Sequence, residues 1–276
     1  MAGRKLSSYR GVRALVTGAS SGIGRLLAQR LAAGGARVAL AARRADELEA
    51  LAAEIRSAGG EALVVPCDVG ERASVEAACD EVIAAWGGVD LLVNNAGYGA
   101  HRTFLEWDYD DIERMMRVNY LGSVLFTKRL LPGMVERKKG WVVFVSSMAG
   151  HVGTPEEAPY AATKFALRGL AEGLSIEIED AGVHVLTVCP GVIQTPFFDQ
   201  EMLARMPPVA LKQFVPVEGM VDAIQKALAK GQHHLTYPRN LAVAFVVKAI
   251  APTFFRGQVK KNTFDALRKA QRAKGE

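Results

Sequence analysis

The chain has 276 residues, a formal net charge of +5 and a mean hydropathy of +0.10, and half of its residues are hydrophobic. This composition excludes a disordered chain, and the length fits one large α/β domain or two small ones, with enough chain to bury a sizeable core. The charge is uneven, since residues 239–276 hold nine basic residues against two acidic ones and carry +7, which leaves −2 for residues 1–238.

The N-terminal residues Met1–Gly11 contain no apolar run of the kind a signal peptide needs, so we expect a cytoplasmic protein. The three cysteines, Cys67, Cys79 and Cys189, are far apart and form no CxxC motif, which argues against a disulfide framework and a zinc site. The late apolar stretch Leu241–Val247 is too short for a membrane-spanning helix, which needs ~20 residues.

Short β-rich runs alternate with stretches of helical spacing as far as Cys189. The expected strands are Val12–Thr17, Arg37–Ala41, Ala62–Val65, Val89–Val93, Trp141–Val145 and Val183–Val188. Apolar strands that alternate with helices indicate buried parallel strands joined by right-handed crossovers. We therefore predict a single domain over residues 1–238, built as a three-layer α/β doubly wound parallel sheet.

After Cys189 the alternation becomes irregular. A proline-punctuated segment, Gln194–Phe214, is a candidate lid, and a helix is expected over Val217–Lys230, followed by a last strand at His233–Tyr237. Residues 239–276 are predicted to form a basic, amphipathic C-terminal extension of two helices separated by Pro252.

A glycine-rich turn follows the first expected strand and leads into a helix. Glycines permit a tight turn and close approach of the backbone to a ligand, and the N-terminus of the helix offers free N–H groups to a pyrophosphate. The turn comprises Gly18, Ser20, Ser21, Gly22, Ile23 and Gly24.

The second expected strand is followed by two arginines, Arg43 and Arg44, instead of the acidic residue that usually binds the ribose hydroxyls of NAD. Guanidinium groups bind phosphate through charge-assisted hydrogen bonds. The sequence therefore predicts NADP(H) as cofactor.

Tyr160 and Lys164 are four residues apart in a helical stretch, so they share one face. A free tyrosine has a pKa of about 10, and a neighbouring ammonium is expected to lower it toward the working range. Ser147 follows the strand Trp141–Val145 and is the candidate to bind a substrate carbonyl, with Ser146 as the competing candidate.

These residues resemble the motifs of the short-chain dehydrogenase/reductase (SDR) family, which has a Rossmann fold. The similarity extends from Arg10 to Pro196 and includes the glycine-rich turn, Asn94–Gly97, Asn119, Ser147, Tyr160, Lys164 and Pro190-Gly191. It implies a catalytic set of Asn119, Ser147, Tyr160 and Lys164, with Tyr160 as acid and base, and an assembly of two or four subunits. It further implies cofactor contacts from Asp68, Val69, Asn95, Ala96, Gly97, Tyr160, Lys164, Pro190, Gly191, Ile193 and Thr195.

The candidate lid is rich in apolar side chains, which predicts a hydrophobic ketone or alcohol as substrate. Parts of the sequence are similar to 3-ketodihydrosphingosine reductases and to steroid-type carbonyl reductases, and the alternatives are a 3-oxoacyl thioester or a small carbonyl compound. The lid residues are Phe197, Phe198, Met202, Leu203, Met206, Val209, Leu211 and Phe214.

An alternative to an enzyme is a catalytically idle member of the family, which would bind dinucleotide as a sensor or scaffold.

The remaining interpretations concern the C-terminal segment and two adjacent histidines. The basic segment 239–276 either rests on anionic lipid, or Leu241–Phe255 packs on the lid and the final basic helix is solvated. Nucleic acid is not expected because no recognised binding module is present. His233-His234 lack a spaced Cys or His partner, so no metal is predicted.

Overall fold

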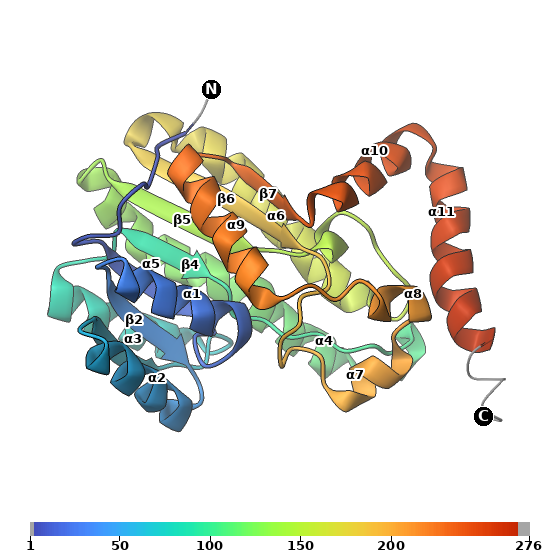
Figure 1. Ribbon diagram of the computed structural model, residues 1–276, viewed down its shortest axis with the longest axis horizontal. Coiled ribbons are helices and arrows are strands. Elements are labelled where there is room, and N and C mark those ends of the chain that lie inside the picture. Colours follow the sequence, from blue (N-terminus) through green and yellow to red (C-terminus); the bar gives the residue numbers. More distant parts are fainter. Residues whose placement is uncertain (1–2, 270–276) are drawn as a thin grey trace.

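The computed structural model describes residues 3–269 and contains one sheet of seven parallel strands in the order β3-β2-β1-β4-β5-β6-β7 (Figure 1). The strands are β1 (Arg13–Thr17), β2 (Arg37–Ala42), β3 (Glu61–Pro66), β4 (Leu91–Asn94), β5 (Gly140–Val145), β6 (Val183–Pro190) and β7 (His234–Tyr237). The predicted doubly wound α/β fold is confirmed, and the chain reverses its direction of winding between the adjacent strands β1 and β4.

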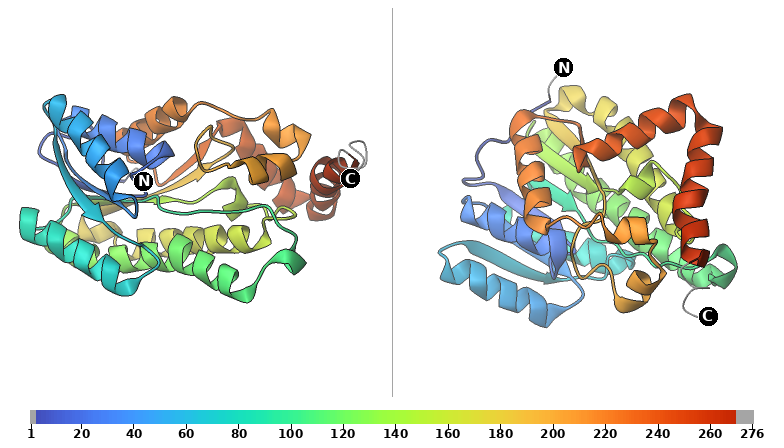
Figure 2. Two further views of the ribbon diagram at one scale, coloured as in Figure 1. Left: turned by 90° about the horizontal axis from the view of Figure 1, so that it is seen from below. Right: turned by 45° about the vertical axis from the view of Figure 1, so that its right-hand side comes forward.

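Helices cover both faces of this sheet, which gives the three layers seen from below in Figure 2. The helices of the main body are α1 (Gly22–Ala33), α2 (Ala45–Ser57), α3 (Arg72–Trp86), α4 (Tyr109–Met116), α5 (Gly122–Glu136), α6 (Ala158–Glu177), α7 (Gln200–Arg205), α8 (Pro208–Leu211) and α9 (Val217–Lys230). One hydrophobic core joins α1, α2 and α9 to the sheet, and a second joins α3, α5 and α6 to the opposite face.

The strand pleat sends alternate side chains into these two cores. In β1, Ala14 and Val16 belong to the core beneath α1, whereas Leu15 belongs to the core beneath α5. Because both faces are covered, β5 and β6 are buried along their whole length, which explains why β5 is apolar throughout and β6 is interrupted only by His184 and Thr187.

The lid segment differs from the rest of the chain in having only short helices, α7 and α8. Two ion pairs of Arg205 hold α7 in place. Its Nη2 lies 2.8 Å from Glu106 Oε2, and its Nε lies 3.2 Å from Glu156 Oε2. The segment predicted as a lid is therefore tied to the loops before α4 and α6.

The C-terminal extension forms α10 (Val243–Ile250) and α11 (Pro252–Lys260), which project beside the body on the right of Figure 1. Pro252 is the first residue of α11, where a proline is tolerated because its missing N–H would have no intrahelical partner. Arg272 and Lys274 of the predicted basic extension lie outside the described residues. Among residues 3–269 no helix is both long and apolar enough to cross a membrane.

Candidate active site

The glycine-rich turn passes so close to the end of β4 that larger residues would collide there. Gly18 has a φ of +66°, and a Cβ on it would lie 2.9 Å from the Cα of Ala96. Gly22, with a φ of +56°, begins α1 and packs against Thr195. The backbone of the turn is thereby exposed to the space above the strands, where parallel α/β sheets bind ligands.

Thr17 and Asn95 connect the carboxyl ends of β1 and β4. Thr17 Oγ1 accepts hydrogen bonds from the backbone N–H groups of Asn95 and Ala96, both at 3.0 Å. Asn95 Nδ2 donates to the carbonyl of Thr17 at 2.9 Å. The Asn95–Gly97 turn is held in place by these bonds, and the sequence pattern carried no signal for the role of Thr17 as acceptor.

A cavity of about 990 Å³ lies over the carboxyl ends of the strands. Its lining includes most of the predicted cofactor-binding residues: Gly18, Ser20, Ser21, Gly22, Ile23, Arg43, Arg44, Asp68, Val69, Asn95, Ala96, Gly97, Tyr160, Lys164, Pro190, Gly191, Ile193 and Thr195. Gly24 does not line the cavity, and its contact with the cofactor stays a prediction. A Cβ on Gly24 would lie 2.4 Å from the carbonyl oxygen of Gly18, which shows that Gly24 permits close contact between α1 and the turn.

The two arginines after β2 lie at one end of the cavity. Arg44 Nη2 donates to Ser20 Oγ at 2.9 Å, which ties the second arginine to the glycine-rich turn. Arg43 is exposed, and both arginines line the cavity. Ala42, the last residue of β2, is followed directly by Arg43, so the end of this strand carries no acidic residue.

Asp68 also lines the cavity, and its carboxylate accepts hydrogen bonds from other residues of the protein. Although partial burial raises the pKa of Asp68, hydrogen bonds from the Gly70 N–H and from Arg114 outweigh it and hold the pKa below its usual range. Arg114, on α4, also lines the cavity, and the sequence pattern provided no signal for it.

Tyr160, Ser147 and Lys164 line the middle of the cavity. Tyr160 and Lys164 share a face of α6, as predicted, and the Lys164 ammonium lies 5.7 Å from the centroid of the Tyr160 ring. The Ser147 hydroxyl is close enough to the Tyr160 phenol to act on its pKa, whereas the Ser146 hydroxyl donates to the carbonyl of Lys164 at 2.9 Å. Of the two serine candidates, the geometry therefore favours Ser147.

Burial dominates the electrostatics of this group. It raises the pKa of Tyr160 above its ordinary value of 10, even though the hydrogen bond with Ser147 lowers it. Burial also lowers the pKa of Lys164 to about 8. The expectation that Lys164 brings the pKa of Tyr160 down is therefore wrong for this structure, because the loss of solvation exceeds the other effects.

Asn119 is completely buried in a π-helical turn, Arg117–Leu121, between α4 and α5. Its amide donates to the Tyr98 carbonyl at 2.8 Å and to Thr163 Oγ1 at 3.1 Å, and its oxygen accepts from the Tyr98 N–H at 2.9 Å. Asn119 is absent from the cavity lining and lies just behind it, next to Gly97.

Apolar side chains line the part of the cavity beyond Tyr160. Of the eight predicted lid residues, Phe197, Phe198, Met206 and Val209 line the cavity, while Met202 is buried in the protein. The C-terminal extension adds Leu241, Ala244 and Phe255 to the same lining as the lid, in line with the alternative in which Leu241–Phe255 packs on the lid.

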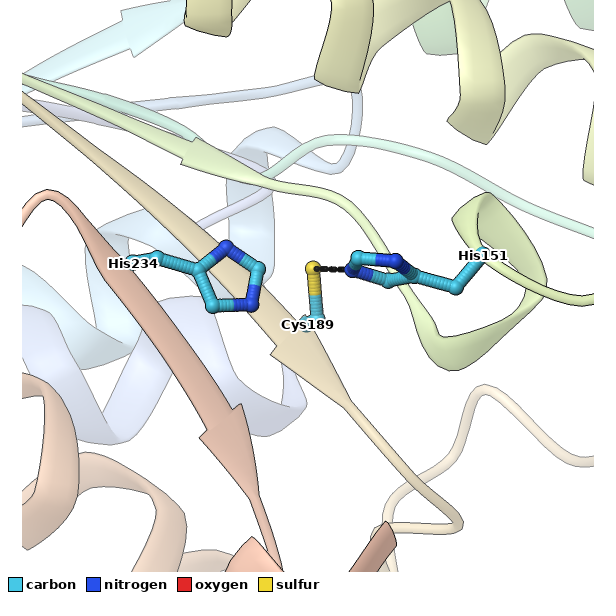
Figure 3. Close-up of side chains that lie close together, drawn as sticks. All are labelled: His151, Cys189 and His234. Carbon is cyan, nitrogen blue, oxygen red and sulfur yellow. Dashed lines mark hydrogen bonds between the residues drawn. The ribbon is translucent and has the colours of Figure 1, made fainter. Parts of the chain in front are cut away.

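His151, Cys189 and His234 lie close together, although they are far apart in the sequence (Figure 3). Their potential ligand atoms all lie within 4.8 Å of one another, and His151 Nε2 is 3.4 Å from Cys189 Sγ. The premise that His234 has no histidine or cysteine partner is wrong, because β6, β7 and the loop after β5 bring these residues together.

The hydrogen bonds of His151 run in the opposite direction to those of a histidine that binds a metal. Arg168 Nη1 lies 2.9 Å from His151 Nδ1, and since a guanidinium only donates, His151 carries its proton on Nε2, facing the sulfur. A metal-bound histidine gives its second N–H to an acceptor instead. Burial, with Arg168, His234 and Lys248, lowers the pKa of His151 to about 4, and burial raises the pKa of Cys189 to about 12.

Comparison with known proteins gives consistent matches. A family model described as short chain dehydrogenase matches residues 13–205. The chain is 34% identical over 255 residues to a fatty acyl-CoA reductase of Acinetobacter baylyi, a match that covers 89% of this chain and 82% of that protein. Several other curated relatives match over 57 to 61% of their own length.

Solved structures share the same architecture. A short chain dehydrogenase/reductase from Burkholderia phymatum in complex with NAD has a TM-score of 0.80 at 24% identity, covering 88% of this chain and 95% of that chain, which shows the fold alone. A metagenomic short-chain oxidoreductase in complex with NADP has a TM-score of 0.69 at 30% identity, covering 83% and 95%.

Proposed function

Because the chain belongs to the short chain dehydrogenase family, we propose that it is an NADP(H)-dependent oxidoreductase that interconverts a ketone and a secondary alcohol on a hydrophobic substrate. The observation that carries the proposal is the convergence of Ser147, Tyr160 and Lys164 in one cavity, between a glycine-rich turn and an apolar wall.

The residues of the turn fit a dinucleotide. Because Gly18 has no Cβ, the turn after β1 can approach the end of β4 closely and leave its backbone free to contact a ligand. Arg43 and Arg44 supply positive charge where an acid would repel a 2′-phosphate, which supports NADP(H) over NAD(H). The related metagenomic enzyme holds NADP, and the one from Burkholderia phymatum holds NAD. When bound, the cofactor supplies or accepts the hydride.

The chain's own residues orient the carbonyl and move the proton. In reduction the Tyr160 phenol donates its proton to the substrate oxygen, and its raised pKa keeps that proton in place near neutrality. The Ser147 hydroxyl donates a hydrogen bond to the same oxygen and polarises the carbonyl. Lys164 would hold the ribose of a bound cofactor, and Asn119 orders the backbone at Tyr98 behind the site.

The apolar wall supports a hydrophobic substrate. Phe197 and Phe198 come from the lid, and Leu241 and Phe255 come from the C-terminal extension, so two distant segments contribute to one apolar surface. A small polar ketone would leave this surface uncovered, whereas a long-chain or steroid ketone would bury it.

The test measures NADPH consumption with a long-chain 3-keto lipid, a steroid ketone, a 3-oxoacyl thioester and a small polar ketone, and repeats it with NADH. We expect kcat/KM to be highest for a hydrophobic ketone with NADPH. Tyr160→Phe should lower it by roughly 10²–10⁴-fold, which is the usual contribution of a positioned acid. Equal efficiency with the small polar ketone would refute the hydrophobic substrate class.

The principal alternative is a dinucleotide-binding sensor without catalysis. It predicts that NADPH binds with the same affinity to wild type and Tyr160→Phe, and that no ketone of the panel is reduced by either. Turnover that depends on Tyr160 would exclude this alternative.

A further inference from the structure

Helix α10 has an inner face that anchors it to the body. The Phe245 ring stacks on the His151 ring with centroids 3.7 Å apart and planes 15° from parallel. Lys248 Nζ donates to the His151 carbonyl at 2.6 Å. Ala244 on the same side lines the cavity. These contacts fix which face of α10 is turned toward the protein.

The outer face of α10 is apolar and uncovered. Val243, Val246 and Ile250, at positions i, i+3 and i+7, are 63%, 57% and 78% exposed. Phe254, in the first turn of α11, is 60% exposed. Four large apolar side chains on two consecutive helices are therefore exposed, which is typical of an interaction surface.

Basic residues accompany this apolar face. Residues 239–269 include seven basic residues and one acidic residue, Asp265. Lys248 is bonded to the body, so the other six basic residues and Asp265 leave a charge of +5 available to an outside surface. Arg256, Lys260 and Lys261 are exposed, and Lys261 lies seven residues after Phe254 and so follows it along the helix. This charge complements an anionic surface.

We propose that the outer face of α10 and α11 rests on an anionic lipid bilayer. A soluble polyanion would account for the charge but not for the exposed apolar side chains, whereas a bilayer surface takes up both. This proposal rests on the proposed function in one respect: Ala244 and Phe255 of the same two helices line the cavity, so a hydrophobic substrate would pass from the lipid into the site.

The experiment is co-sedimentation of the full chain with vesicles of phosphatidylcholine alone or mixed with phosphatidylglycerol, at low and high salt. We expect binding to the anionic vesicles only, and weaker binding at high salt. Ile250→Asp/Phe254→Asp and Lys260→Gln/Lys261→Gln should each lower the vesicle partition coefficient roughly tenfold or more.

Matched controls change equivalent residues elsewhere. Ile176→Asp alters a side chain on α6 that is 73% exposed, and Lys226→Gln/Lys230→Gln removes two exposed lysines of α9. These variants should bind vesicles as wild type does. Absence of binding to anionic vesicles at low salt, or equal binding by all variants, would overturn the proposal.

A second copy of the chain is the competing occupant of this face. Light scattering on wild type and on Ile250→Asp/Phe254→Asp identifies it, because a dimer that only this variant abolishes would overturn the lipid proposal. Turnover of a short soluble ketone without vesicles, which the variants should retain, tests the proposed function separately. Vesicle binding by a chain that reduces no ketone would refute the proposed function and leave the lipid proposal standing.

Discussion

Replacing Lys164 with methionine should separate stability from activity. The side chain is 4% exposed, and its ammonium donates one hydrogen bond, to the Val145 carbonyl at 3.0 Å. Burial lowers the pKa of this ammonium from 10.5 to about 8. Methionine keeps the apolar stem and removes the charge, so Lys164→Met should lose turnover without losing the fold.

The magnitude follows from linkage between protonation and folding. The lower pKa means that keeping Lys164 charged in the folded protein costs about 3 kcal/mol at about pH 7. The variant leaves the Val145 carbonyl without this donor, which costs about 1–3 kcal/mol. We therefore expect Lys164→Met to be as stable as wild type at about pH 7, or more stable by up to about 2 kcal/mol.

The sign of the pH dependence is a sharper test. Between about pH 8 and pH 10.5 the unfolded chain keeps a proton on Lys164 that the folded chain has lost, so this group makes wild type more stable as the pH rises. The free energy of unfolding of wild type relative to Lys164→Met should rise by about 2 kcal/mol from about pH 7 to about pH 10. Other titrating groups are common to both proteins and cancel in this difference.

Urea unfolding of both proteins at the two pH values measures this difference. Lys226→Met, which removes an exposed lysine on α9, is the control for the loss of a surface charge. A difference that stays constant with pH, or that moves in the opposite direction, would refute the reasoning that burial of the ammonium opposes folding.

Three further predictions concern the cofactor, the turn and the lid. Arg44→Glu should raise the KM for NADPH roughly 10- to 100-fold, with a much smaller change for NADH in steady-state kinetics. Gly24→Ala should destabilise by about 1–3 kcal/mol in urea unfolding, because its Cβ meets backbone at 2.4 Å, whereas Gly169→Ala on α6, with nothing within 4 Å, should stabilise by up to about 1 kcal/mol. Arg205→Ala should raise the KM for a hydrophobic ketone several-fold, since it releases α7 from Glu156, and should lower the unfolding midpoint, since it leaves the Glu156 carboxylate, 8% exposed, without its cation. An unchanged KM would contradict a positioning role for this bond.

Features that depend on neighbours along the chain could be predicted from the sequence. The alternation of apolar strands with helices determined the parallel sheet, because its period reflects which faces must be buried. The Tyr160–Lys164 spacing placed both side chains on one helix face, and the run of basic residues after Arg239 located the charge in the C-terminal extension. Each of these is a local property of the chain.

Features that depend on contacts between distant segments were decided only by the tertiary structure. Ser147 rather than Ser146 faces Tyr160, because Ser146 is bonded to the Lys164 carbonyl across the loop after β5. The pKa of Tyr160 rises, since burial depends on all the elements around it. Sheet order brings His151 beside Cys189, and α10 beside the cavity. The spacing of residues along the sequence does not predict these contacts, because they depend on how the sheet and the helices pack against one another.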